Sequence, residues 1–143
     1  MFHRSVRDSR RWIGFLAVGC LGCASPLEPV APPSGGTELT LDFATYQRDV
    51  APILLSQGCS TAECHGGGIR GTYELSPLDA PNAQFDFEQT AIQVNVAELT
   101  ASPILAEPLA ESAGGTPHQH EPFASIWDSD YQTILAWIEA GVQ

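Results

Sequence analysis

The sequence predicts a small, mainly α-helical domain with long loops, preceded by an export leader and a tether. Two segments, 42–58 and 128–141, carry apolar residues at helical spacing and predict the first and last helices of the domain. A glycine- and proline-rich stretch between them predicts loops. Hydrophobic residues make up 43% of the 143 residues, with 3 Trp, 3 Tyr and 6 Phe, so we expect a folded core rather than a disordered chain.

The charge of the chain is strongly acidic. Six arginines stand against 17 Asp and Glu, which gives a net charge of -11, and four of those arginines fall within the first eleven positions. Nucleic acids and anionic membrane surfaces are both bound through clustered Lys and Arg. The sequence therefore disfavours both as direct partners.

Residues 1–19 have the pattern of an export signal. Their apolar run, 12–19, is too short for a membrane-spanning helix, which needs about 20 residues. The residues that end at Cys20 resemble the lipobox of bacterial lipoproteins, with Cys23 as the alternative lipidated residue and an ordinary signal peptide as the other interpretation. Removal of 1–19, which carries +3, would leave a net charge of -14. We expect an exported bacterial protein, periplasmic or anchored to the outer membrane as a lipoprotein.

Residues 20–40 are predicted to be a tether. The part from 24 to 40 holds four prolines and two glycines and shows little apolar periodicity. The folded domain is expected to run from 41 to 143, and we find no internal repeat in it.

The first helix is expected to begin after Asp42, a residue type that caps helix N-termini. Pro52 cannot donate an N–H, so a kink or a restart is expected there, and Gly58 is placed to end the helix. The apolar residues at helical spacing in this segment are Phe43, Tyr46, Val50, Ile53 and Leu54.

The middle of the domain is predicted to be loop-rich. Residues 66–84 contain several glycines and prolines and should be mostly loop. A helical pattern follows at 86–96, where the Val and Ile content also leaves a strand open. Ser102 and Pro103 have the arrangement of an N-cap followed by proline at the first helical position, so we expect a short helical turn there.

The last helix has the clearest pattern in the chain. Asp128 or Ser129 is expected to cap it, and Gly141 is expected to end it. Its apolar face is formed by Tyr131, Ile134, Leu135 and Ile138.

The residues that carry the most chemical information are Cys59, Cys64 and His65. Two cysteines with a histidine directly after the second are the signature of covalent haem attachment, usually as C-x-x-C-H. The two thiols bond to the haem and the adjacent histidine binds the iron as its proximal ligand. Here the spacer has four residues instead of two, and the two extra residues can bulge out without moving the thiols apart.

Two other interpretations of this motif remain open. Cys59 and Cys64 could form a disulfide in an exported domain, or they could bind structural zinc together with His65 and a second histidine. Neither interpretation explains why a histidine follows the second cysteine directly, whereas haem attachment accounts for all three residues.

A haem iron also needs a sixth ligand or an open position. The only methionine is Met1, inside the leader, so ligation by methionine is excluded. His118 and His120 remain, in a loop that follows two glycines and a proline. We expect His118 to be the distal ligand, with His120 as the alternative.

The domain resembles the single-haem cytochrome c-like domains with widened C-x4-C-H motifs that occur in exported bacterial proteins. In that family the cysteines bind haem, the next histidine is the proximal ligand, and a histidine after a Gly-Gly turn is the distal one. The resemblance implies these roles for Cys59, Cys64, His65 and His118. It covers most of 43–141, through the stretches 49–54, 59–67, 102–105, 108–109, 114–118, 123 and 131–138.

The resemblance also implies a cytochrome c-like fold around one haem c, with the first and last helices packed across each other. One departure is that the glycines that usually follow the distal histidine are replaced by the segment 119–122, so the choice between His118 and His120 stays open. Five residues are candidates for the haem pocket or the helix contact, namely Phe43, Tyr46, Leu54, Trp127 and Trp137.

The function expected from these features is electron transfer by a covalently bound haem with His/His ligation, rather than catalysis. A haem enzyme with an open sixth position is one alternative. A haem-free exported module, held by a disulfide between Cys59 and Cys64 or by a Cys/His zinc site, is another. The acidic domain suits a redox partner protein with a basic docking face.

Overall fold

The computed structural model of the chain describes residues 38–68 and 72–143. This part is mainly helical, as expected, and it also contains three isolated β-bridges. The expected leader and most of the tether, with Cys20 and Cys23, lie outside the described residues. The elements, in chain order, are α1 (Phe43–Thr45), the π-helix η1 (Tyr46–Val50), α2 (Ala51–Ser56), α3 (Ala83–Ile92), the 3₁₀-helix η2 (Leu99–Ala101), α4 (Pro103–Ala106), the 3₁₀-helix η3 (Glu111–Ala113) and α5 (Ser129–Gly141).

The first helical segment, α1 to α2, is continuous but changes its winding before Pro52. Asp42 caps it as expected, because the carboxylate accepts a 2.7 Å hydrogen bond from the amide of Thr45. A proline has no N–H to donate, and its ring crowds the carbonyl four residues earlier. The turn before it is widened into η1, in which the amide of Ala51 donates to the carbonyl of Tyr46. The expected interruption is therefore a wider turn rather than a break.

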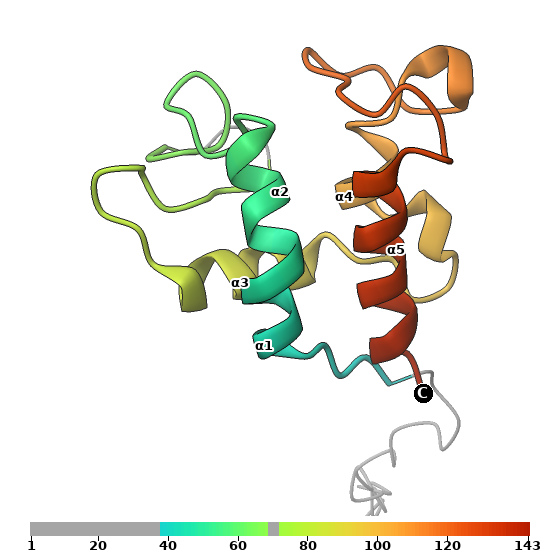
Figure 1. The fold of residues 1–143 in the computed structure, drawn as a ribbon, viewed down its shortest axis with the longest axis horizontal. Helices are drawn as coiled ribbons and strands as arrows, with labels where there is room; N and C mark the ends of the chain where they lie inside the picture. The colour runs from blue at the N-terminus through green and yellow to red at the C-terminus, as the bar shows by residue number, and fades with distance from the viewer. Residues whose placement is uncertain (1–37, 69–71) are drawn as a thin grey trace, which may run out of the picture. The chain divides into compact units, whose positions relative to one another are not determined.

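α5 runs antiparallel to this first segment (Figure 1). The rings of Tyr46 and Trp137 lie 5.6 Å apart, and Nε2 of Gln57 donates a 2.8 Å hydrogen bond to the carboxylate of Asp130. Asp128 caps α5, as expected, by accepting from the amide of Asp130. The contact between the first and last helices that the family resemblance implied is present in the structure.

The start of the described domain is tied to its C-terminus. The amide of Thr40 donates a 2.7 Å hydrogen bond to the carbonyl of Gly141, and the main chains of Glu38 and Gln143 exchange two hydrogen bonds. Residues 38–40, which the sequence analysis assigned to the tether, are thus packed against the end of α5.

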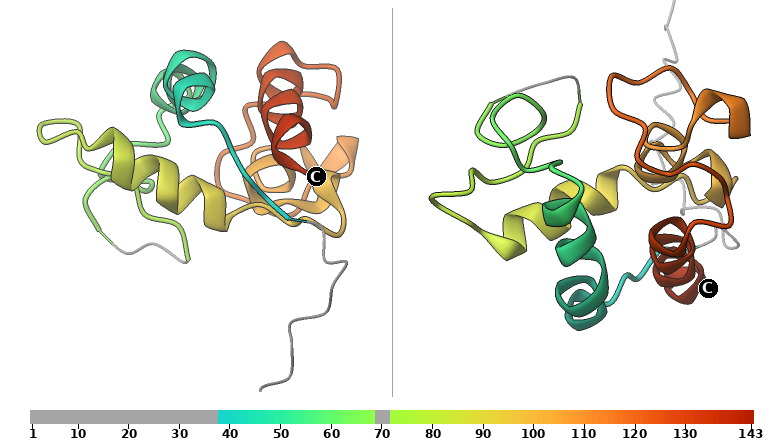
Figure 2. Two further views of the ribbon diagram at one scale, coloured as in Figure 1. Left: turned by 90° about the horizontal axis from the view of Figure 1, so that it is seen from below. Right: turned by 45° about the horizontal axis from the view of Figure 1, so that its top comes forward.

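α3 runs across the first helical segment, as the view along that segment shows (Figure 2, left). Asn82 caps it by accepting from the amide of Phe85 at 3.1 Å. The helix expected over 86–96 is therefore present but begins three residues earlier and ends four residues earlier. The strand alternative for this segment is wrong.

The connections between the helices are long, as expected. The described residues between 66 and 82 form loops and turns.

Pro103 opens α4 as predicted, but Ser102 does not cap this helix with its side chain. Its buried hydroxyl instead accepts a 2.9 Å hydrogen bond from the amide of Asn95, which joins the end of α3 to the start of α4.

The hydrophobic core lies between the helices and continues beneath the loops that join them. The buried core residues are Tyr46, Val50, Ile53, Leu54, Tyr73, Leu75, Ile104, Leu105, Leu109, Phe123, Tyr131, Ile134, Trp137 and Ile138.

Among the described helices, none is both long and apolar enough to cross a membrane.

Candidate functional site

The end of α2 determines the position of the first cysteine of the motif. Gly58 has a φ of 77°, a conformation that glycine adopts at little cost, and it ends the helix as expected. The amides of Gly58 and Cys59 donate to the carbonyls of Leu55 and Leu54 at 3.1 and 2.9 Å. These two bonds satisfy helical carbonyls that would otherwise lack a partner. Cys59 therefore leaves α2 in a defined direction.

The spacer of the motif folds back on itself. The amide of His65 donates a 2.9 Å hydrogen bond to the carbonyl of Cys59, and the amide of Cys64 donates to the carbonyl of Thr61 at 3.0 Å. The chain between the two cysteines thus forms a closed loop, and the histidine returns to the level of the first cysteine. The four residues of the spacer thus bulge out between the two cysteines.

Cys59 and Cys64 are both free thiols in the structure, so the disulfide alternative gains no support from it. Burial raises the pKa of the Cys59 thiol to about 11, with a smaller contribution from the neighbouring Cys64. Cys59 is therefore protonated at neutral pH and is a poor nucleophile or metal ligand on its own, because both reactions need the thiolate.

His65 is oriented by the loop that follows the motif. Its Nδ1 donates a 3.0 Å hydrogen bond to the main-chain carbonyl of Tyr73, and the two rings pack with centroids 4.8 Å apart. Because Nδ1 carries the proton of this bond, Nε2 is the nitrogen available to a metal. A main-chain carbonyl at the other ring nitrogen is a common support of metal-binding histidines.

Tyr73 is in turn attached to α3 through Thr90, and sequence reasoning did not identify either residue. The Thr90 hydroxyl donates to the carbonyl of Asp86 at 2.7 Å, so it can only accept from the two tyrosines that face it. Tyr73 donates at 2.9 Å and Tyr46 at 3.4 Å. Burial raises the pKa of Tyr73 well above its usual value, which keeps the phenol protonated and able to donate.

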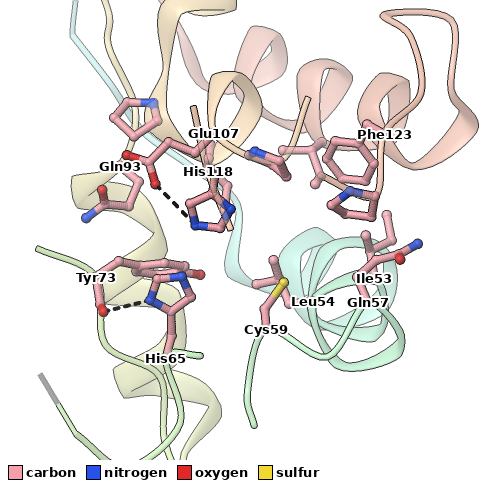
Figure 3. Close-up of a pocket in the computed structure, with 15 residues that line it drawn as sticks. Ile53, Leu54, Gln57, Cys59, His65, Tyr73, Gln93, Glu107, His118 and Phe123 are labelled. Carbon is pink, nitrogen blue, oxygen red and sulfur yellow. Dashed lines mark hydrogen bonds and ion pairs between the residues drawn. The ribbon is translucent and has the colours of Figure 1, made fainter. Parts of the chain in front are cut away.

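The ring of His118 faces that of His65 (Figure 3). Their centroids lie 6.2 Å apart and their planes differ by 9°. A metal bound by both rings would lie in the plane of each ring, next to its Nε2. Two metal–nitrogen bonds of about 2.0–2.1 Å, together with the distance from each nitrogen to its ring centre, match a centroid separation of this size only when the two Nε2 atoms are turned toward each other. Nδ1 of His118 lies 2.8 Å from the carbonyl of His120, and Nε2 lies 3.9 Å from a carboxylate oxygen of Glu107, beyond hydrogen-bond range.

The ring of His120 is engaged elsewhere. Its Nε2 lies 3.0 Å from the carbonyl of Gln57, at the end of α2. Of the two histidines in the loop, His118 is thus the one whose ring faces His65.

His65 and His118 both line two adjoining pockets. One is a recess between α2, α4 and α5, and the other is an open cavity of about 680 Å³ next to the motif loop. Cofactor and ligand sites commonly have volumes of about 300–1,000 Å³. The apolar and thiol side chains that line the recess include Ile53, Leu54, Cys59, Tyr73, Ile104, Phe123 and Ile134.

The aromatic residues singled out from the sequence have different positions. Trp127 is 80% exposed in the loop before α5, so its assignment to a pocket or a helix contact is wrong. Phe43, Tyr46 and Trp137 form an aromatic cluster with Phe87, at the contact between the first segment, α3 and α5. They belong to the helix contact, and Leu54 lines the recess.

Within residues 38–68 and 72–143, no group of three or more His, Cys, Asp and Glu side chains is placed to hold a metal ion. The zinc alternative therefore gains no support from the described residues. What the structure brings together is two facing imidazoles, two thiols on the loop of one of them, and an apolar recess. Imidazole nitrogens and thiolates are both residue types that bind metals.

Comparison of the chain with protein-family models, with curated proteins and with solved structures finds no match.

Proposed function

We propose that this domain binds one haem c covalently and transfers electrons, and that its fold is of the cytochrome c type. The observation that carries the proposal is the pair His65 and His118. Their rings face each other at 6.2 Å, and the Nδ1 of each lies at a main-chain carbonyl. Both Nε2 atoms are thereby left to bind a metal.

Each residue of the motif has a role in this proposal. Cys59 and Cys64 would attach the haem through thioether bonds, His65 would be the proximal ligand and His118 the distal ligand. Bound haem would supply an iron that gains and loses one electron. With both axial positions filled by the protein, no position remains for a substrate, so we propose a carrier rather than an enzyme.

The surroundings of the histidines support this role. The recess beside them is lined by Leu54, Ile104, Phe123 and other apolar side chains, which limit the access of water. The polarity and solvent access around a metal influence its redox potential. The hydrogen bond from His65 to Tyr73 holds the proximal ring in one orientation, so little rearrangement would accompany a change of charge.

We further propose that the protein is exported by a bacterium and anchored as a lipoprotein through Cys20, or through Cys23. The proposal depends on the sequence of the leader. Contact with the membrane would be made through this lipid anchor alone.

The charge of the domain supports a redox partner with a basic docking face. Arg48 is the only Arg or Lys among the described residues, and its guanidinium is paired with Asp49 at 2.6 Å. Acidic side chains are therefore not balanced by free cationic ones in this part of the chain. Long-range attraction to a basic partner should weaken as salt is added. The same charge disfavours nucleic acid as a partner.

The test is a pyridine haemochrome spectrum of the full chain, produced in cells that contain the c-type haem attachment machinery. We expect a covalent haem spectrum for the wild type and a shifted spectrum or loss of attachment for Cys59→Ala and Cys64→Ala. Ser60→Ala, within the spacer, is the matched control and should attach haem as the wild type does.

Two outcomes would contradict the proposal in different ways. A colourless wild-type protein would favour the haem-free module. A coloured protein with a high-spin ferric spectrum would favour the open sixth position of an enzyme. A low-spin spectrum that becomes high-spin in His118→Ala is the result that we expect.

A further inference from the structure

We infer that His120 is a positioning residue that fixes the His118 ring opposite His65 by binding the C-terminal end of α2. The inference rests on the proposed function, because it assigns a role to a residue next to the distal ligand. It does not follow from the family resemblance, since this chain departs from the family pattern at residues 119–122.

Two hydrogen bonds connect His118 to α2 through His120. Nδ1 of His118 donates to the carbonyl of His120 at 2.8 Å, and Nε2 of His120 donates to the carbonyl of Gln57 at 3.0 Å. The amide of His120 also lies 3.4 Å from Nδ1 of His118, but that longer contact would need an unprotonated Nδ1. The shorter bond, with the proton on Nδ1, leaves Nε2 of His118 free for the iron.

The carbonyl of Gln57 suits this role because it is the C-cap carbonyl of α2. The last carbonyls of a helix have no partner within the helix, and histidine side chains often bind them. Gln57 is itself anchored, since its side chain donates a 2.8 Å hydrogen bond to Asp130 at the start of α5. His120 thus connects the loop of the distal ligand to the junction of two helices, two residues before Cys59.

The same contacts explain why His120 is not the distal ligand in this arrangement. With Nε2 of His120 donating to the Gln57 carbonyl, only Nδ1 of that ring would be left for a metal. In His118 the bond is made by Nδ1, so Nε2 is left free, and the ring of His118 is the one next to the ring of His65. The two histidines therefore have separate roles, one as ligand and one as the residue that holds the ligand in place.

The inference can be tested in the haem-loaded full chain with His120→Ala, His120→Gln and the control Thr116→Ala, an exposed residue of the same loop. His120→Ala removes the hydrogen bond to the carbonyl of Gln57, so the loop that carries His118 is held less firmly. Added imidazole should therefore displace His118 from the iron more easily. We expect the affinity of the ferric protein for imidazole to rise about threefold to tenfold in His120→Ala. Glutamine keeps an N–H donor of similar reach, so His120→Gln should stay close to the wild type, as should Thr116→Ala.

Two results would overturn the inference. One is an imidazole affinity of His120→Ala within twofold of the wild-type value. The other is a high-spin ferric spectrum for His120→Gln, which would identify His120 as the ligand itself.

A second measurement does not depend on haem. In the haem-free full chain, amide hydrogen exchange of Phe123, which donates to the carbonyl of Pro108 at the end of the loop, should be about threefold to tenfold faster in His120→Ala. Equal rates in the two proteins, or wild-type rates as fast as those of an unstructured peptide, would overturn the inference. A colourless wild type would refute the proposed function, while this comparison would still decide the role of His120.

Discussion

The main-chain carbonyl of Tyr73 accepts a 3.0 Å hydrogen bond from Nδ1 of His65, and the ring of the same tyrosine packs against the imidazole at 4.8 Å. One residue therefore orients His65 through both its backbone and its side chain. Because the Tyr73 hydroxyl is bound to Thr90, the orientation of His65 depends on α3.

Thr90→Val should destabilise the domain. Valine has nearly the same shape, but it leaves the buried hydroxyls of Tyr46 and Tyr73 without their acceptor. A buried donor without a partner costs about 1–3 kcal/mol, so we expect the free energy of unfolding to fall by about 2 kcal/mol or more in a urea titration. Thr133→Val is the matched control, because Thr133 also donates to the carbonyl four residues earlier. Equal losses for the two variants would contradict the role of Thr90.

Gly115→Ala should displace the loop that carries His118. A Cβ atom at position 115 would lie 1.7 Å from the carbonyl oxygen of Leu109 and 3.0 Å from that of Ala106, so the backbone must move. We expect a loss of about 2–4 kcal/mol in stability and a larger high-spin fraction in the haem-loaded protein. Gly68→Ala has open space around the new Cβ and is the control. A Gly115→Ala protein with wild-type stability and spectrum would contradict this close contact.

His118→Met should raise the reduction potential. When the iron of a c-type haem is bound by one histidine and one methionine, its reduction potential is raised. Across haem proteins, the choice of axial ligands changes the potential over a range of about 0.8 V. We expect an upward shift of roughly 0.1 V or more in a redox titration. Gln119→Met introduces the same side chain at the next position and should leave the potential close to that of the wild type. A shift in Gln119→Met but not in His118→Met would argue against His118 as the ligand.

The haem-free chain should lose stability between about pH 9 and pH 11 through Cys59. Burial raises the pKa of this thiol from 9.0 to about 11, so the folded state holds the proton more tightly than the unfolded state. The contribution to stability is complete below pH 9 and is lost as the pH rises towards 11. We expect this loss to be about 1–3 kcal/mol greater in the wild type than in Cys59→Ala, measured by urea unfolding at pH 8 and pH 11. The same loss in both proteins would show that another group is responsible.

Local signals in the sequence predicted much of the helical structure. Asp42 and Asp128 cap the first segment and α5, as predicted. A helix cap involves residues only two or three positions apart, so it can be predicted from neighbouring residues. Gly58 ends α2 for the same reason. The predicted cap of α4 is the exception, because the hydroxyl of Ser102 instead accepts a hydrogen bond from the amide of Asn95, which lies before the helix and outside it.

Long-range packing explains the other differences. Tyr73 and Thr90 were not identified because their roles depend on partners up to 44 residues apart, which no local pattern reveals. Trp127 was a candidate for the haem pocket or the helix contact, but in the loop before α5 its side chain is 80% exposed. Hydrophobic character alone does not decide whether a loop side chain faces the core.

The motif residues Cys59, Cys64 and His65 could be identified without a structure, because their types and spacing are properties of the covalent chain. Under the proposed function, the candidates for the distal ligand were limited to His118 and His120 in the same way, because the only methionine is Met1. Which of these two histidines faces His65 depends on the tertiary structure. That choice depends on the carbonyl of Gln57, 63 residues before His120, which becomes its hydrogen-bond partner only after α2 and the distal loop have packed together.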